Sequence, residues 1–487
     1  MKTCLVMPKI SALAWLVALC LCAGRLPAQS PVVLDVETND AGRLIPPDFC
    51  GLSYELKLVL TNSTTGKYYF SRHNRTLINT FETLGIQHLR VGGNTAERAS
   101  VPIPDDADID SLFGFVRAAR LKAIYTVRME SNSPANAAAV AKYVMDKYKP
   151  WVSCLTVGNE PDKPWKYPVW LEKWRKFTGA ILESAPDAKF CGPSATQAAV
   201  EWSKLFAGDE GGWEHLAYLT QHYYPMRNGD GVTNAARSAA GRQKLLSPEM
   251  YPLYQKFYDV FGPATKAKGI GYRLEESNSY SHGGAEGVSD TFTASLWIVD
   301  YLYWWAWHDA WGINFHTGEK VMRGLPGPDR PNVYTAFTMT TNGVTVLPTG
   351  YGMKLFNLGS QGRLVPATVV SNEDNVNLAA YATLGAHQTL CITILNKEYG
   401  PAGRSATVTL HAGMPSARAS VIYMTAPQGD ITSIHGITIG GAGIKENGAW
   451  HGKWTRLSAA GKDGSITVTV PAATGAVIKL ENRRWLF

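Results

Sequence analysis

The 487-residue sequence contains few charged residues and no long apolar segment after its first residues. Charged residues make up 18% of the chain, and they form no basic cluster of the kind that nucleic-acid binding requires. No segment beyond the start has the run of about 18 uninterrupted apolar residues that predicts a transmembrane helix. The nearest, Leu296 to Trp307, contains Asp300. We therefore expect neither nucleic acid as a partner nor a membrane span.

Cysteine is also scarce, with seven residues, three of which lie within the first 22 positions. The others are Cys50, Cys154, Cys191 and Cys391. None of the four has the C-x-x-C spacing that is typical of metal sites. The first three each fall in a strand-like run, so the sequence predicts buried free thiols rather than a disulfide framework.

Histidine spacing gives no sign of a metal site either. His222, His282 and His316 show no ligand pattern such as H-E-x-x-H. The chain also lacks a glycine-rich dinucleotide-binding turn. We expect neither a metal ion nor a cofactor.

The first 28 residues have the pattern of a secretory signal peptide. Lys2 and Lys9 give a basic start, Ala12 to Cys22 is apolar, and Leu26-Pro27-Ala28 provides a small residue for cleavage. The sequence thus predicts a secreted or periplasmic protein. Without Lys2, Lys9 and Arg25 the formal charge falls from +7 to +4 (7 − 3). This modest positive charge suits an acidic sugar or plain solubility equally well.

Eight strand patterns alternate with helical ones between Phe49 and about His316. Such alternation is typical of βαβ units and a parallel sheet. Eight strands over about 270 residues match an α/β fold of the (β/α)8 TIM-barrel type, which typically has about 250 residues. A doubly wound open sheet is the alternative, but it usually has fewer strands. The predicted strands are Gly51–Tyr54, His88–Val91, Ala123–Arg128, Val152–Val157, Lys189–Gly192, Ala217–His222, Gly271–Leu274 and Trp311–Phe315. The predicted helices include Asn74–Leu84, Ile109–Ala119, Asn136–Lys147, Trp170–Glu183, Met250–Phe261 and Asp290–His308.

After about Pro348 the sequence changes to short alternating runs separated by Gly, Pro and Asn. This pattern predicts a C-terminal all-β sandwich, which the strand-like segment Val32–Val36 is expected to join. The stretch from Gly318 to Arg330, rich in Gly and Pro, is the expected connection region. We predict a signal peptide (1–28), an N-terminal segment of the sandwich (29–48), a catalytic barrel (49–347) and the sandwich (348–487).

Two carboxylate motifs follow strand patterns at corresponding places. Gly158-Asn159-Glu160-Pro161 ends the run Leu155 to Val157, and Glu275-Glu276 ends the run Ile270 to Leu274. Active sites of such barrels gather at the carboxyl ends of the strands, and glycosidic bonds are cut by two carboxylates. The motifs follow the fourth and seventh strands and predict a glycoside hydrolase. Glu160 would be the acid/base, with a pKa raised by partial burial and by the second carboxylate.

The residues around Glu276 allow a more specific comparison. Leu274 to Tyr280, then Gly283-Gly284-Ala285, then Ser289-Asp290-Thr291-Phe292 resemble the nucleophile region of the heparanase and β-glucuronidase family, glycoside hydrolase family 79. The Ser-Asp-x-Phe block sets the register of this resemblance and implies that Glu276 is the nucleophile. Glu275 then occupies a position that a small residue usually holds.

The resemblance to family 79 extends to the other strand ends. Phe49 to Glu55 is similar to the first strand, which implies that Glu55 contacts sugar hydroxyls. Leu89 to Asn94 resembles the second-strand Arg-x-Gly-Gly motif, which implies that Arg90 orients the nucleophile and Asn94 lines the site. A salt bridge at the barrel rim is the other reading of Arg90. Asn159 would hydrogen-bond the sugar 2-hydroxyl.

Two further motifs carry implied roles. Gln221 to Pro225 resembles the sixth-strand His-Tyr-Tyr motif, which implies that Tyr223 hydrogen-bonds the nucleophile while Tyr224 packs. Asn332-Val333-Tyr334 resembles the segment whose tyrosine meets the C6 carboxylate of glucuronic acid.

One departure from the family concerns that carboxylate. Family members often have a tyrosine followed by glycine five residues after the nucleophile, where this chain has Ser281. We therefore expect Tyr280, the backbone around Gly283, and Tyr334 to share carboxylate recognition.

Three functions follow from these patterns. The first is a retaining exo-β-glucuronidase acting on a glucuronic-acid-containing glycoside or glycan. The second is a heparanase-like endo-hydrolase of a sulfated polysaccharide, for which the insertion Pro225 to Leu246 could either close one end of the cleft or bind sulfates through Arg227, Arg237 and Arg242. The third, a non-catalytic carbohydrate-binding protein, is disfavoured because both carboxylates and the Asn-Glu pair are present. The sequence leaves the oligomeric state open.

Overall fold

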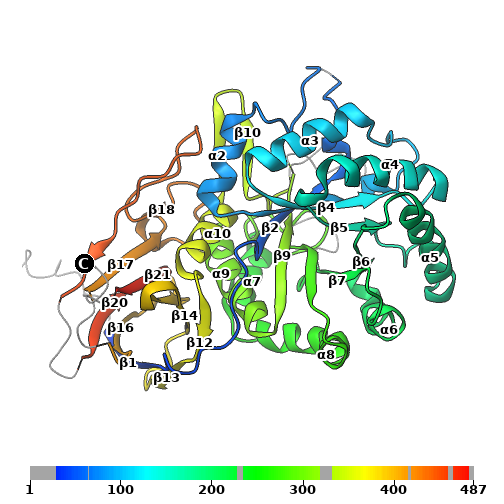
Figure 1. Cartoon of the computed structure of the whole chain (residues 1–487). Coiled ribbons are helices and arrows are strands. Elements are labelled where there is room, and N and C mark those ends of the chain that lie inside the picture. Colours follow the sequence, from blue (N-terminus) through cyan, green and yellow to red (C-terminus); the bar gives the residue numbers. More distant parts are fainter. Residues whose placement is uncertain are drawn as a thin grey trace, which may run out of the picture.

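A computed structural model describes residues 29–63, 65–227, 234–318, 332–414, 418–458 and 464–481. The predicted signal peptide and nearly all of the Gly318 to Arg330 connection lie outside these residues. A barrel surrounded by helices occupies one side of the molecule and a β domain the other (Figure 1).

Eight parallel strands close into a barrel in chain order, from β2 to β9. Each of the eight predicted strands overlaps one of them, so the TIM-barrel prediction is confirmed. Most of their residues are buried, because helices cover the outside and side chains fill the interior. The strands are β2 (Cys50–Glu55), β3 (His88–Gly92), β4 (Lys122–Val127), β5 (Val152–Val157), β6 (Phe190–Ala195), β7 (Leu216–Tyr223), β8 (Tyr272–Ser277) and β9 (Ala310–His316).

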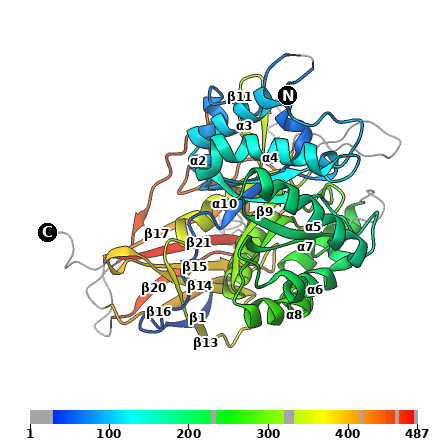
Figure 2. The same cartoon turned by 45° about the vertical axis from the view of Figure 1, so that its right-hand side comes forward.

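Helices pack around the outside of the barrel (Figure 2). Side chains satisfy the free N–H groups where several of them begin: the Ser133 side chain accepts from the Asn136 amide at α4, and Asp105 and Asp108 form a capping box at α3. Gly85, with φ of 75°, ends α2 in a left-handed conformation that glycine adopts without strain. The helices are α2 (Arg75–Leu84), α3 (Asp106–Ala118), α4 (Pro134–Tyr148), α5 (Tyr167–Ser184), α6 (Glu201–Glu210), α7 (Ala235–Leu246), α8 (Met250–Lys268) and α9 (Phe292–Trp307).

Helix α9 is buried on all sides along nearly its whole length. It packs against β9 on one side and against α10 (Pro348–Gly359), which leads into the β domain, on the other. Its one acid, Asp300, pairs with Lys397 of the β domain over 2.8 Å. The apolar run in this part of the sequence thus belongs to a helix between two domains. Within the described ranges, no helix is long and apolar enough to cross a membrane.

The β domain consists of two sheets that share one apolar core. The first sheet has the order β13-β1-β16-β20, and the second has the order β12-β14-β15-β21-β17-β18, with β19 beside β17. Val32 and Val408 of the first sheet meet Ile392 and Ile478 of the second in this core. The prediction of an all-β C-terminal domain is confirmed, and the segment before the barrel contributes β1 to it. The strands are β1 (Gln29–Val36), β12 (Arg363–Val365), β13 (Ala367–Ser371), β14 (Leu378–Leu384), β15 (Leu390–Asn396), β16 (Ser405–His411), β17 (Arg418–Thr425), β18 (Thr438–Ile439), β19 (Thr455–Arg456), β20 (Ile466–Val470) and β21 (Thr474–Glu481); a separate hairpin joins β10 (Phe337–Thr340) to β11 (Gly343–Val346).

The prediction of free thiols is wrong for two of the cysteines. Cys154 on β5 and Cys191 on β6 form a disulfide inside the barrel, with 5.9 Å between their Cα atoms. The two strands are neighbours in the barrel. The sequence does not reveal the register that brings these two side chains together, because the cysteines are 37 positions apart. Cys50 and Cys391 are buried and free.

Candidate active site

The carboxyl ends of β5 and β8 bring Glu160 and Glu276 together. One carboxylate oxygen of each, and one ring nitrogen of His222 from β7, all lie within 4.8 Å of one another. The chain turns sharply after β5, with a φ of 89° at Gly158 and 49° at Glu160. The amide of Glu160 donates to the Ser194 carbonyl over 2.9 Å, which fixes this turn against the end of β6. Positive φ is rare for a non-glycine residue and is typical of functional sites.

Glu276 is surrounded by groups that stabilise its charged form. Its Oε2 accepts from Arg90 Nη1 over 2.7 Å, and its Oε1 accepts from the Tyr224 hydroxyl over 2.9 Å. The Nδ1 atoms of His316 and His222 lie 3.7 and 3.9 Å from Oε2. Burial opposes ionisation, but the charges of His316, His222 and Arg90 outweigh it and hold the pKa of Glu276 well below its usual range. Glu276 is therefore an ionised carboxylate at neutral pH.

Glu160 also has cationic neighbours, which contradicts the prediction of a raised pKa. Its Oε1 lies 3.2 Å from His222 Nδ1, and its Oε2 forms an ion pair with Lys163. Burial raises the pKa of Glu160, as does the charge of Glu276. The hydrogen bond and charge of His222, together with Lys163, outweigh both, so the pKa is lowered. The sequence predicted burial and the second carboxylate but not these two cations.

Arg90 connects Glu276 to the turn that carries Glu160. It is fully buried, and besides Glu276 it donates from Nη2 to the Asn159 side-chain oxygen over 2.5 Å and from Nη1 to Ser53 Oγ over 3.0 Å. Since the amide oxygen of Asn159 is engaged, its NH2 group is left as a donor. Arg90 thus lies at the centre of the site, which excludes a rim salt bridge.

Glu55 is the last residue of β2 and lies beside His316. It accepts from the backbone N–H of Thr95 over 2.7 Å and from Thr95 Oγ1 over 2.6 Å, and it lies 3.7 Å from His316 Nε2. Burial opposes its charge, but His316 and Thr95 lower the pKa of Glu55. Asn94 is exposed at the rim and accepts from Lys163 Nζ over 2.9 Å, on the Glu160 side.

The predicted roles of Tyr223 and Tyr224 are reversed in the structure. Tyr223 turns outward, donates to the Leu253 carbonyl and stacks on Phe257, whereas Tyr224 reaches Glu276. Side chains alternate along a strand, so His222 and Tyr224 share the inner side and Tyr223 faces the helices. That period-two alternation was the signal in the sequence that would have given the correct assignment.

The residues expected at the C6 carboxylate do not all meet. Tyr334 is buried; its hydroxyl is in hydrogen-bond contact with Tyr224 and with the backbone N–H of Gly283, and burial and Glu276 raise its pKa. The Tyr280 hydroxyl instead packs against Gly241 of α7. The contact is so close that a Cβ atom added at Gly241 would lie 2.8 Å from the hydroxyl oxygen. The structure therefore places Gly283 and Tyr334 together near Glu276 and turns Tyr280 away. Ser281 contacts its neighbour His282 over 3.0 Å.

Three side chains at the site had no catalytic role in the sequence prediction: His222, His316 and Lys163. Burial opposes the charged form of both histidines, but the surrounding carboxylates raise their pKa values, that of His222 to about 9. Glu160, His222 and Glu276 are close enough to hold a metal ion. Each carboxylate already has a cationic partner, however, and a proton on His222 competes with any metal. The arrangement favours proton transfer over metal binding.

Comparisons with known proteins agree with this geometry. Residues 380–478 match the glycosyl hydrolase family 79 C-terminal beta domain. No curated protein sequence matches the chain. Among solved structures, a 4-O-α-L-rhamnosyl-β-D-glucuronidase from Fusarium oxysporum is similar at 17% identity and a TM-score of 0.66, covering 93% of this chain and 100% of its own.

Other similar structures act on different sugars. A family 51 arabinofuranosidase from Xanthomonas axonopodis pv. citri has 14% identity and a TM-score of 0.66, and a β-xylosidase from Caulobacter crescentus has 13% and 0.61; each comparison covers 93% of this chain and 100% of the other. At such identities these likenesses show the fold alone. The family model covers only the β domain, and its match agrees with the barrel motifs around Glu276. The chain is a glycoside hydrolase whose C-terminal domain is similar to that of family 79.

Proposed function

We propose that this glycoside hydrolase is a retaining exo-β-glucuronidase that removes terminal glucuronic acid after secretion. The observation that carries the proposal is the approach of a Glu160 oxygen to within 4.8 Å of a Glu276 oxygen. Carboxyl groups in retaining enzymes lie about 5–5.5 Å apart, whereas inverting enzymes need about 6.5–9.5 Å to admit a water.

The reaction would proceed by two displacements. Ionised Glu276 attacks the anomeric carbon while a proton from Glu160 goes to the leaving oxygen, which releases the aglycone and leaves a glycosyl ester on Glu276. Glu160 then takes a proton from water, and the resulting hydroxide breaks the ester and frees the sugar. Arg90 and Tyr224, which both donate to Glu276, hold its carboxylate in place for the attack.

Support for a glucuronic acid substrate comes from Tyr334 and Gly283. The Gly283 N–H contacts the Tyr334 hydroxyl, which in turn contacts Tyr224. A substrate carboxylate that replaced these contacts would accept from both donors, and hydrogen bonds to a charged group are the strong ones. The similar Fusarium enzyme is a glucuronidase, and family 79 includes β-glucuronidases. Exo action is supported by Arg242 in the insertion, whose guanidinium donates to the Gly287 carbonyl over 2.5 Å and is thereby committed to the fold.

The Tyr334→Phe substitution tests substrate choice. A hydrogen bond to a charged group contributes about 1.5–3 kcal/mol, so we expect kcat/KM on an aryl glucuronide to fall by about one to two powers of ten. Hydrolysis of the matching glucoside and xyloside, which lack the carboxylate, should barely change. An equal loss on all three sugars would mean that Tyr334 acts on the site through Tyr224 and does not bind the carboxylate.

A further inference from the structure

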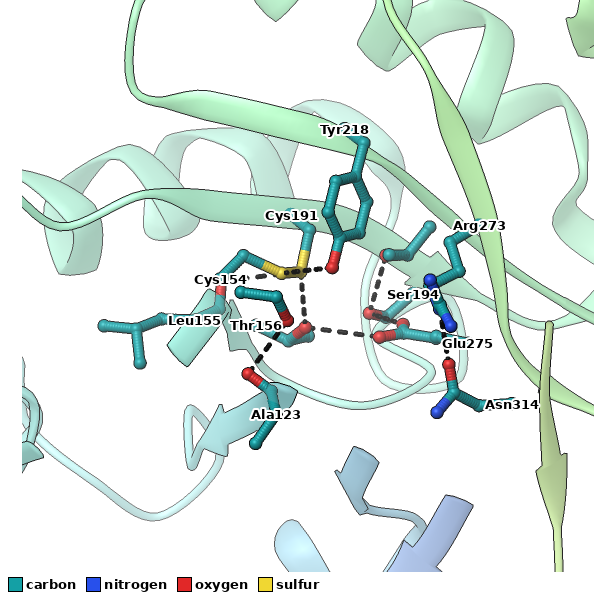
Figure 3. Close-up of a disulfide and its surroundings, with 12 residues drawn as sticks. Ala123, Cys154, Leu155, Thr156, Cys191, Ser194, Tyr218, Arg273, Glu275 and Asn314 are labelled. Carbon is teal, nitrogen blue, oxygen red and sulfur yellow. Dashed lines mark hydrogen bonds between the residues drawn. A yellow bond between two sulfur atoms is a disulfide. The ribbon is translucent and has the colours of Figure 1, made fainter. Parts of the chain in front are cut away.

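Glu275 is a buried acid that the two displacements do not use. Its side chain is fully buried, one position before Glu276. Thr156 Oγ1 donates to its Oε2 over 3.2 Å, and the Ser194 hydroxyl donates to its Oε1 (Figure 3). Burial opposes its charge, but the hydrogen bond with His222 and the charge of Arg90 lower the pKa of Glu275. An additional carboxylate thus lies beneath the catalytic pair.

His222 lies between this carboxylate and the acid/base. Its Nδ1 is 3.2 Å from Glu160 Oε1, and its Nε2 is 3.6 Å from Glu275 Oε1. Only a protonated imidazole carries a hydrogen on both ring nitrogens and so faces a carboxylate with a donor on each side. The other charged groups near the ring are Glu276, 3.9 Å from Nδ1, and Arg90, 3.5 Å from Nε2.

We propose that Glu275 is a positioning residue for the acid/base, acting through His222: its negative charge keeps a proton on His222, beside Glu160. This inference rests on the proposed role of Glu160. In the resting site His222 is protonated and Glu160 is ionised. Proton transfer across the 3.2 Å contact leaves His222 neutral and Glu160 protonated, ready to protonate the leaving oxygen. The proton that Glu160 later takes from water returns to His222, so the cycle balances.

The charges around His222 explain why Glu275 is needed. Burial alone lowers the pKa of a histidine, and Arg90 lowers it further. Glu276, Glu160 and Glu275 outweigh both effects and raise the pKa to about 9. Glu276 loses its charge when the glycosyl ester forms. During the second displacement Glu275 therefore remains the permanent anion at His222, beside the ring nitrogen that faces away from Glu160.

The position of Glu275 is fixed by neighbouring strands. Thr156 Oγ1 also lies 3.1 Å from Cys191 Sγ, and the Cys154–Cys191 disulfide joins β5 to β6 directly beside it (Figure 3). Ser194, the other partner of Glu275, has a φ of 58° at the end of β6. The carboxylate is therefore held on the strands that carry the acid/base and its supporting turn.

Nuclear magnetic resonance of 15N-histidine-labelled protein tests the proposal without a substrate. His222 is identified by the signal that is absent from His222→Asn. In the wild-type chain we expect its pKa near 9, and in Glu275→Gln we expect a fall of at least about one unit because one of three nearby anions is gone. Glu275→Asp, which keeps the charge, should restore most of the value. Glu210→Gln, which removes a buried acid on α6 paired with Arg175, is the control and should leave His222 unchanged.

Two results would overturn the proposal: a wild-type His222 pKa at or below about 6.5, the ordinary value, or a Glu275→Gln pKa equal to the wild-type one. The kinetic arm uses any aryl β-glycoside that the wild-type enzyme hydrolyses. The alkaline limb of kcat/KM should move to lower pH by at least about one unit in Glu275→Gln, whereas a purely structural defect would lower the rate equally at every pH. If no glycoside is hydrolysed, the proposed function fails while the resonance arm still decides the link between Glu275 and His222.

Discussion

Replacing Glu276 by Gln should abolish turnover, lowering kcat on an aryl glucuronide by at least about three powers of ten, or roughly 4 kcal/mol of transition-state stabilisation. The amide is nearly isosteric but cannot form the glycosyl ester through which a retaining enzyme proceeds. Stopped assays of the variant and the wild-type enzyme under the same conditions measure the loss of kcat. Arg90 and Tyr224 would still contact the amide, so the thermal midpoint should change little.

Glu275→Gln is the matched control for this substitution. Both acids are buried on β8, one residue apart, but Glu275 accepts from Thr156 and Ser194, whereas Glu276 accepts from Arg90 and Tyr224. We expect it to remain active, with a loss of about one power of ten at neutral pH that follows from the altered proton on His222. An inactive Glu275→Gln together with an active Glu276→Gln would show that the nucleophile is one residue earlier.

The Glu160→Ala variant should show a loss that depends on the leaving group. General acid catalysis contributes about 10²–10⁴-fold, so an alkyl glucuronide, whose leaving group needs a proton, should lose about that much. Nitrophenolate is a leaving group that needs no proton, so the first displacement of a nitrophenyl glucuronide should proceed at nearly the wild-type rate. Glycosyl-enzyme should then accumulate, because no base activates the water.

Azide provides the companion measurement for Glu160→Ala. It needs no base, so it should restore nitrophenyl release and yield the β-glucuronosyl azide, while wild-type enzyme should not respond. A uniform loss on both substrates, unaffected by azide, would assign the acid/base role elsewhere.

Much of the fold could be predicted because it depends on local pattern. Each barrel strand is a short apolar run between helical segments, and the two motifs with Glu160 and Glu276 mark strand ends in a way that needs no knowledge of register. Once the barrel closes, strands four and seven must present their carboxyl ends to one cavity. The strand count is therefore enough to bring the two motifs together, whereas the choice of Glu276 over Glu275 depends on the resemblance of the Ser-Asp-x-Phe block.

The errors concern contacts between strands. Cys154 and Cys191 pair because β5 and β6 are adjacent in a particular register. The motif resemblance favours Tyr223 over Tyr224, whereas the alternation of β7 places Tyr224 inside; β7 also has a register shift after Gln221 that no local pattern indicates. The lowered pKa of Glu160 depends on His222, which arrives from a strand more than 60 positions away, so the sum of charges could not be obtained from the sequence.

The most direct test of the central claim is a proton nuclear magnetic resonance time course of aryl β-glucuronide hydrolysis in deuterated buffer. If Glu276 and Glu160 carry out a double displacement, the first sugar signal to appear should be the β-anomer of free glucuronic acid, followed by slow mutarotation to the α-anomer. First release of the α-anomer would contradict the retaining mechanism and the roles assigned to both carboxylates. If the aryl glucuronide is not hydrolysed while the matching aryl glucoside is hydrolysed rapidly, the assignment of a uronic acid substrate is contradicted.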